Sequence, residues 1–140
     1  MYKNILVAYD GSDGAKLALE HAIKLAKELD SKVIALWVRS SLPHYPETID
    51  EVEEEREASD AFVKKITREI LHYSKKYEVD VKGETRSGHP AKTILEFAKE
   101  NQCDLIVLGH RGHSGLWGSF LGHTADKVSE NAHCSVLIVR

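Results

Sequence analysis

The sequence predicts one α/β domain with a doubly wound, Rossmann-like sheet of five parallel strands and helices on both faces. Short continuous apolar runs occupy residues 5–8, 33–38, 105–108 and 136–139, which is typical of strands covered on both faces. Between them, apolar residues recur at three- and four-residue steps, which indicates amphipathic helices. Strands that alternate with helices over 140 residues favour a parallel sheet with a single core.

The chain opens with a strand, a helix and a second strand, which together predict a right-handed crossover. Ser12 or Asp13 can cap the start of the helix. The predicted apolar stripe of this helix is Ala15, Ala18, Leu19, Ala22, Ile23, Ala26 and Leu29.

A long helix is predicted to begin around Glu47, after a loop that contains two prolines. Its opening is rich in Asp and Glu, which suits the positive end of a helix dipole and favours a solvated face over an acidic binding site. The residues expected to pack on the sheet are Ala58, Phe62, Ile66, Ile70 and either Tyr73 or Tyr77. Val79 and Val81 then alternate with charged residues, so we expect a half-exposed third strand at an edge of the sheet.

The second half repeats the alternation. Pro90 lies near the first position of a helix, where its missing N–H does no harm. The buried face of this helix is predicted to be Ala91, Ile94, Leu95 and Ala98, and a last helix that starts near Gly122 is predicted to bury Leu121, Ala125, Val128 and Ala132. The final strand, Ser135–Val139, is expected at the other edge of the sheet. Because an apolar edge invites pairing, we expect a two-fold homodimer through this strand.

Composition narrows the function classes. A net charge of −3 predicts no broad basic surface, so nucleic acid is a poor candidate partner. No apolar run approaches the roughly 18 residues of a membrane span, and residues 1–5 lack the features of a signal peptide. We therefore expect a cytoplasmic protein without a membrane partner. Cys103 and Cys134 are expected to be small buried hydrophobic residues rather than a disulfide.

A glycine-rich loop follows the run at 105–108 and leads into the last helix. Glycine lets the backbone approach a ligand closely, and the N–H groups at a helix start bind anions. Arg111 adds a cation, although it could equally be a solvated loop residue. In doubly wound sheets ligands bind where the strand order reverses, outside the carboxyl ends of the strands. Asp10 and the glycine loop would share that rim if the first and fourth strands are neighbours.

Two phosphate-binding motifs are excluded. No Gly-Lys pair occurs, so the P-loop signature is absent, and residues 10–14 after the first strand do not supply G-x-G-x-x-G. The spacing Gly109-x2-Gly112-x9-Gly122 instead resembles the nucleotide-binding signature of the universal stress protein family, usually G-x2-G-x9-G-[ST]. The resemblance covers the whole chain, 1–140, because residues 3–12 and 135–139 also look like the family.

The resemblance implies a stress-response or regulatory protein that binds ATP. We expect Mg²⁺ to bridge the phosphates, because it would need few protein ligands. It implies that Ala8 and Asp10 line the adenosine end and that the backbone of Val38 meets the adenine. The residues that would wrap the ribose and phosphates are Gly109, His110, Arg111, Gly112, His113, Ser114 and Gly115. Those at the helix start that would contact phosphate are Gly122, His123, Thr124 and Ala125. His123 stands where the family usually has Ser or Thr, so backbone N–H groups rather than a hydroxyl are expected to make this contact.

Three functions remain open at this point: a nucleotide-dependent regulatory protein, a slow ATPase, and a dimeric interaction module without nucleotide. No residue is an evident base for hydrolysis, so binding with at most slow turnover is expected. Three loop histidines could bind a transition metal, but their spacing matches no recognised ligand set. Asp10 could instead cap the first helix, and His89 is interpreted as a surface loop residue.

Overall fold

The computed structural model describes residues 1–40, 48–110 and 120–140, and it confirms the predicted fold class. The elements in chain order are β1 (Asn4–Ala8), α1 (Asp13–Leu29), β2 (Lys32–Ser40), α2 (Ile49–Tyr77), β3 (Val81–Gly88), α3 (Pro90–Glu100), β4 (Leu105–Gly109), α4 (Phe120–Asn131) and β5 (Ser135–Val139). Over the described residues, no helix is both long enough and apolar enough to cross a membrane.

The five strands form one parallel sheet in the order β3-β2-β1-β4-β5. Ile5 of β1 lies opposite Val33 of β2 on one side and opposite Leu105 of β4 on the other. The condition for Asp10 and the glycine loop to share one rim, that the first and fourth strands are neighbours, is therefore met. The strand order reverses between β1 and β4, which is where sheets of this kind form ligand sites. The third and last strands lie at the two edges, as predicted.

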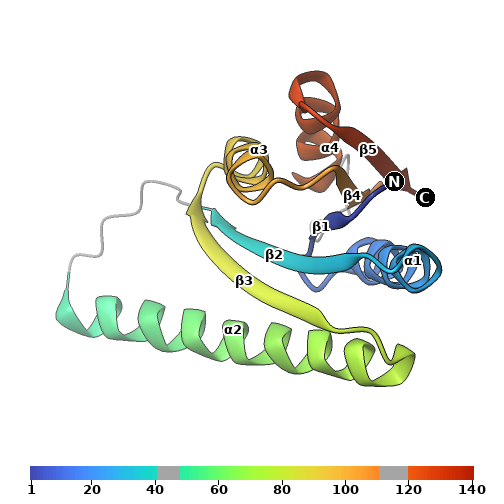
Figure 1. Ribbon diagram of the computed structural model, residues 1–140. Coiled ribbons are helices and arrows are strands. Elements are labelled where there is room, and N and C mark those ends of the chain that lie inside the picture. Colours follow the sequence, from blue (N-terminus) through green and yellow to red (C-terminus); the bar gives the residue numbers. More distant parts are fainter. Residues whose placement is uncertain (41–47, 111–119) are drawn as a thin grey trace.

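Helices cover both faces of the sheet, with α1 and α2 on one face and α3 and α4 on the other (Figure 1). Successive residues of β1 point to opposite faces. Ile5 and Val7 enter the core beneath α1 and α2, while Leu6 and Ala8 enter the core beneath α3 and α4.

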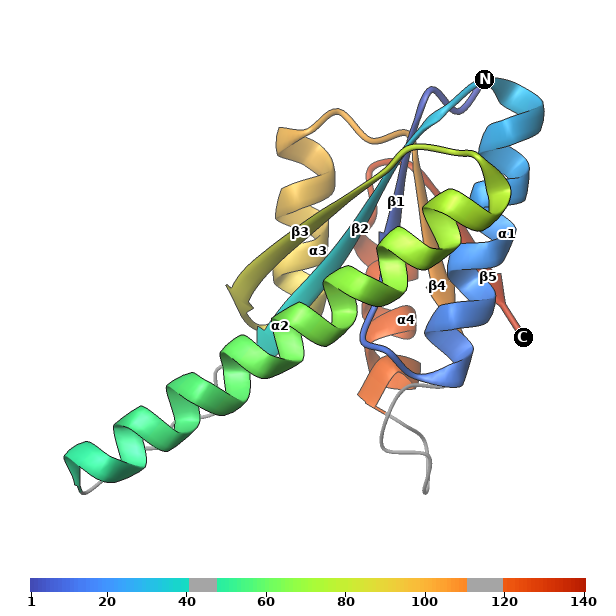
Figure 2. The same cartoon turned by 90° about the horizontal axis from the view of Figure 1, so that it is seen from below.

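Helix α2 departs from the prediction at its start. It begins at Ile49 because the side-chain oxygen of Thr48 accepts a hydrogen bond from the N–H of Glu51 (3.1 Å) and caps the first turn. A helix of 29 residues is about 43 Å long, more than the eight-residue strand β3 can cover. Its amino-terminal half runs beyond the sheet (Figure 2). Ala58 is exposed there, so the expectation that it packs on the sheet is wrong, whereas Tyr73 and Tyr77 both pack against the core.

Other differences are small. Leu29 is exposed because it is the last residue of α1, and α3 buries Phe97, which the predicted stripe omitted, while Leu95 is half-buried. Helix α4 begins at Phe120, and the side chain of Leu121 lies outside the described residues. Both cysteines are free, as expected. Cys103 is buried, and burial raises the pKa of its thiol to about 11, while Cys134 is half-buried.

Candidate functional site

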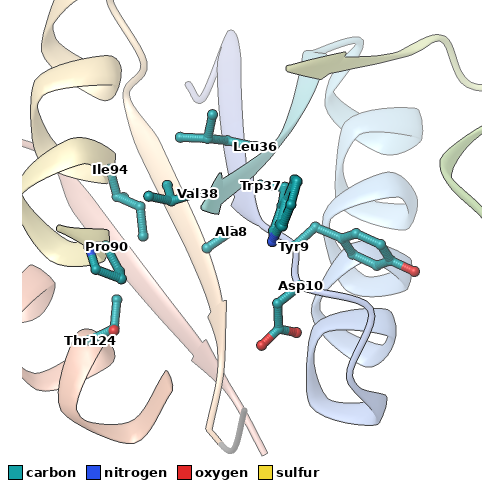
Figure 3. Close-up of a pocket in the computed structure, with 9 residues that line it drawn as sticks. All are labelled: Ala8, Tyr9, Asp10, Leu36, Trp37, Val38, Pro90, Ile94 and Thr124. Atoms are coloured by element: carbon teal, nitrogen blue, oxygen red, sulfur yellow. The ribbon is translucent and has the colours of Figure 1, made fainter. Parts of the chain in front are cut away.

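A pocket opens at the carboxyl edge of the sheet, beside the point where the strand order reverses (Figure 3). Its lining residues come from β1 and the turn after it, from β2, and from the starts of α3 and α4: Ala8, Tyr9, Asp10, Leu36, Trp37, Val38, Pro90, Ile94 and Thr124. The sequence-predicted residues Ala8, Asp10, Val38 and Thr124 therefore meet in one place, although they are up to 116 positions apart in the chain.

Most of the wall is apolar. Ala8, Leu36 and Ile94 are buried members of the core beneath α3 and α4, and Val38 packs against the same core. Pro90, the first residue of α3, adds a rigid ring to one side. An apolar cavity with a few polar groups at its margins is the usual form of a small-molecule site.

The backbone of Val38 supplies hydrogen-bonding groups to this cavity. The last β1 residue, Ala8, pairs with Leu36, and the N–H of Tyr9 donates to the carbonyl oxygen of Leu36 (2.9 Å). Strand β2 continues past this point, paired on its other side with β3. Because backbone groups of successive strand residues point to alternate sides, Val38 directs its N–H and C=O toward the side that β1 has left. The pairing of β1 with β2 ends at Ala8 and Leu36, two residues before Val38.

Asp10 contributes the acidic side chain of the pocket. One carboxylate oxygen, Oδ1, accepts the N–H of Ser12 (2.9 Å), which orders the turn after β1. The helix cap itself is Ser12, whose Oγ accepts the N–H of Ala15 (3.2 Å), so the alternative that Asp10 caps α1 is not what the structure shows. The other oxygen of Asp10 makes no hydrogen bond within the described part of the chain. Figure 3 places Asp10 across the pocket from Pro90 and Thr124.

Two aromatic residues connect the pocket to α2. Tyr9 is only 1% exposed, and its hydroxyl donates to Oε2 of Glu69 (2.9 Å). Burial, together with the hydrogen bond from the hydroxyl to Glu69, raises the pKa of Tyr9 far above its usual value, so this phenol is neutral. Trp37 packs on Phe62 with ring centroids 4.7 Å apart. Sequence reasoning missed both residues. Each lies in or beside an apolar run, where an aromatic side chain is interpreted as part of the hydrophobic core.

A second pocket adjoins the first at the junction of α3 and α4 and shares Pro90 and Thr124 with it. Its lining residues are His89, Pro90, Ala91, His123, Thr124 and Lys127. Thr124 is 5% exposed, whereas His123 is exposed. The hydroxyl that His123 does not provide thus lies one residue later, in Thr124. Ala125 is buried in the core beneath α3 and α4 and lines neither of the two pockets.

Two of the predicted site residues, Gly109 and His110, have structural roles. The α-carbon of Gly109 lies so close to α1 that a β-carbon there would be 2.6 Å from the carbonyl oxygen of Gly14. The glycine is therefore required by packing, independently of any ligand. The N–H of His110 donates to the carbonyl oxygen of Val139 (2.7 Å), and so it continues the pairing of β4 with β5. Gly122 lies in the first turn of α4.

The predicted residues from Arg111 through Gly112, His113 and Ser114 to Gly115 lie outside the described residues. In the described part of the chain, no group of three His, Cys, Asp or Glu side chains is placed to hold a metal ion. A nucleotide fits the donor set that is described: an apolar slot for the base, the Val38 edge for its polar atoms, and a carboxylate for ribose hydroxyls.

Together, the strand order and the pocket at the reversal point define a doubly wound α/β protein with a pocket at the carboxyl edge of its sheet. The universal stress protein family model matches residues 1–140, and the chain belongs to that family. It is 41% identical to universal stress protein YxiE of Bacillus subtilis over all of both chains.

Solved structures agree with this family. Universal stress protein UspA from Lactobacillus plantarum superimposes with a TM-score of 0.85 at 31% identity, covering 99% of this chain and 98% of that one. A universal stress protein solved in complex with cAMP superimposes with a TM-score of 0.75 at 27% identity, covering 99% and 97% of the two chains.

Proposed function

We propose that this universal stress protein binds ATP with Mg²⁺ and acts as a nucleotide-dependent regulatory protein in the cytoplasm. The observation that carries the proposal is the apolar slot at the strand-order reversal, edged by the backbone N–H and C=O of Val38. An adenine ring has both donors and acceptors along one edge, which such a strand edge can pair with. The cAMP complex of a relative at 27% identity supports an adenine nucleotide as the ligand class.

The first test is whether the purified protein carries nucleotide, seen as excess absorbance at the wavelength of adenine and as ATP released on denaturation. Calorimetry of the stripped protein then gives the affinities for ATP, AMP and cAMP. Absence of bound nucleotide together with no heat of binding for any of the three would leave the dimeric interaction module as the better reading.

A sharper test uses Asp10→Asn, which keeps the shape of the side chain and its contact with the Ser12 N–H. We expect nucleotide affinity to fall about tenfold, because a carboxylate accepts ribose hydroxyls more strongly than an amide does. Asp13→Asn is the matched control, since Asp13 is exposed in the first turn of α1 and carries the same charge. Equal losses in the two variants would point to net charge rather than to a ribose contact.

The expected role is binding rather than turnover. Asp10 is the single carboxylate among the described residues that line the pocket, and one of its oxygens already holds the turn. Hydrolysis requires an oriented water and stabilisation of the transferring phosphoryl group. We therefore expect at most slow release of phosphate from ATP. Release at several per second by the pure protein would establish the ATPase instead.

A regulatory protein acts through a surface that contacts another chain. We propose that β5 is such a surface and forms a two-fold homodimer. Leu137 and Ile138 on this edge strand are 38% and 37% exposed, whereas the opposite edge, β3, carries charged residues such as Lys82, Glu84 and Arg86. Charged edges resist pairing and apolar ones promote it. Ile138→Lys should convert the dimer to a monomer in sedimentation, while Thr85→Lys on β3 should not. A wild-type monomer at micromolar concentration would remove this part of the proposal.

A further inference from the structure

Tyr9 connects the pocket to the helices on the opposite face of the sheet. The residue before it, Ala8, belongs to the core beneath α3 and α4, whereas Tyr9 belongs to the core beneath α1 and α2. Figure 3 shows the Tyr9 ring directed away from Pro90 and Thr124 on the far wall of the pocket. A contact made by this ring on the α2 side can therefore influence the pocket margin.

Tyr9 is held at both its backbone and its side chain. Its N–H donates to the carbonyl oxygen of Leu36 (2.9 Å), and its hydroxyl donates to Oε2 of Glu69 on α2 (2.9 Å). The side chain is buried, and a buried hydroxyl that loses its acceptor must move or remain unpaired at a cost. Glu69 therefore fixes the position of Tyr9.

The same carboxylate lies beside the turn that follows Tyr9. Oε2 of Glu69 is 3.7 Å from the place that a β-carbon on Gly11 would take. Gly11 has φ +83°, a conformation that favours glycine. Asp10 lies between Tyr9 and Gly11, and its Oδ1 accepts the N–H of Ser12 (2.9 Å). The direction of the Asp10 carboxylate thus depends on two neighbours that lie against Glu69.

Helix α2 has a second attachment beside the pocket. The ring of Phe62 packs on Trp37, which lines the pocket, and Ile66 and Ile70 are buried in the core. Phe62 and Glu69 are seven residues apart, about two turns, so they lie on the same side of α2. Because these apolar contacts anchor this stretch of the helix, a change at Glu69 alone should leave α2 in place.

We propose that Glu69 is a positioning residue of the nucleotide site, which acts through Tyr9 to direct the carboxylate of Asp10 toward the ribose. The inference rests on the proposed nucleotide function and deepens it, because it assigns part of the ribose selectivity to a residue on the opposite face of the sheet. Glu69 does not line the pocket. Its effect should therefore be confined to ligands that carry ribose hydroxyls.

The main experiment measures by calorimetry the affinities for ATP and for 2′,3′-dideoxy-ATP, which lacks the ribose hydroxyls. Glu69→Ala and Tyr9→Phe should each weaken ATP binding about threefold to tenfold and leave the dideoxy analogue within about twofold, because only the hydrogen bonds to Asp10 are weakened. The double variant should lose no more than either single variant, since both remove the same hydrogen bond.

Two further variants serve as controls. Glu69→Gln keeps an acceptor oxygen for the Tyr9 hydroxyl, so it should stay within about twofold of the wild type for both ligands. Glu57→Ala removes an exposed carboxylate from the same helix and should not change the preference for ATP over the dideoxy analogue. Equal losses for the two ligands, additive losses in the double variant, or an unchanged preference in Glu69→Ala would overturn the positioning role. A wild type that binds ATP would still support the proposed function.

A second experiment needs no nucleotide. The NMR shift of the Ser12 amide proton reports its hydrogen bond to Asp10, and Asp10→Ala gives the shift of the broken bond. In Glu69→Ala and Tyr9→Phe this shift should move toward that value, while the Thr93 amide, bonded to the carbonyl oxygen of His89, should not move. This result would sustain the control of Asp10 by Glu69 even if ATP fails to bind, in which case only the proposed function falls. An unchanged Ser12 shift in both variants would reject the inference.

Discussion

Helices α1 and α3 both start at the rim of the site, but their first turns are built in opposite ways. Helix α1 is closed: Ser12 caps it, Asp13 lies in its first turn, and Asp10 orders the preceding residues. Helix α3 is open: His89 makes no cap hydrogen bond, and no acidic residue follows in the first turn. Basic side chains, rather than acidic ones, surround that end.

The difference shows which helix start has its N–H groups and dipole satisfied by the protein's own side chains. At α1 the protein's own oxygens satisfy the helix start, so this end contributes structure and presents a carboxylate to the pocket. At α3 no side chain caps the first N–H groups and no acidic residue offsets the dipole, at a small cost in stability.

The largest expected effect concerns the closed end, where β4 packs against α1. In Gly109→Ala the new methyl group would lie 2.6 Å from the carbonyl oxygen of Gly14, so backbone must move. We expect a loss of about 1–3 kcal/mol in the free energy of unfolding, measured by urea denaturation. Gly83→Ala is the control, because its β-carbon would make an ordinary 3.5 Å contact with Ile70. Equal losses in both variants would contradict the packing argument.

At the carboxyl end of α3, unlike at its start, the protein's own backbone supplies a hydrogen-bond partner. The N–H of Cys103 donates to the carbonyl oxygen of Ala98 (2.8 Å), and burial raises the pKa of the thiol from 9.0 to about 11. The folded state holds this proton more tightly than the unfolded chain does, so the stabilisation is complete below about pH 9 and is lost as the pH rises toward 11.

The expected size follows from the change in pKa. Between about pH 8 and about pH 10.5 the free energy of unfolding of the wild type should fall by roughly 2 kcal/mol more than that of Cys103→Ala. Urea denaturation of both proteins at the two pH values measures the difference. Parallel pH dependences would show that the thiol keeps its ordinary pKa in the folded state.

Removing the caps tests the comparison directly. Ser12→Ala should destabilise the protein by about 1 kcal/mol, because the N–H of Ala15 loses its acceptor. His89→Ala should change stability by less than about 0.5 kcal/mol, because no cap hydrogen bond is lost. Thermal unfolding of the two variants measures both values. Similar losses would mean that the two helix starts are equivalent after all.

The smallest effect, and the most informative one, comes from closing the open end. His89 has φ −74° and ψ 124°, an extended conformation in which an Asp side chain can cap a helix. His89→Asp should therefore raise the free energy of unfolding by about 0.5 kcal/mol. Urea denaturation of the variant and the wild type measures the difference. Unchanged or lower stability would show that the start of α3 does not gain from a side-chain cap.

Much of the fold could be read from local patterns. The apolar runs at β1 and β4 and the helical stripe of α1 predicted the correct elements, because burial on both faces and burial on one side leave different periodicities. The start of α2 and the exposure of Ala58 could not be read in this way. Both depend on how far the helix extends past a sheet whose length is a property of other segments.

The site was predictable only in part. Ala8, Asp10 and Val38 were assigned through the family resemblance, and they do line one pocket with Thr124. Tyr9 and Trp37 also line it, but nothing in an apolar run distinguishes a pocket wall from core. The glycine spacing likewise does not reveal that Gly109 is needed for its approach to Gly14.

The sequence by itself determined the element types, their order and the family, because each follows from residue patterns within one segment or from a spacing within one loop. Only the tertiary structure decided which residues meet. It placed His89 beside Lys127, Tyr9 against Glu69, and Asp10 across a pocket from Thr124. The physical reason is that a binding site is a property of juxtaposed surfaces, and those surfaces exist only after strands far apart in the chain have paired.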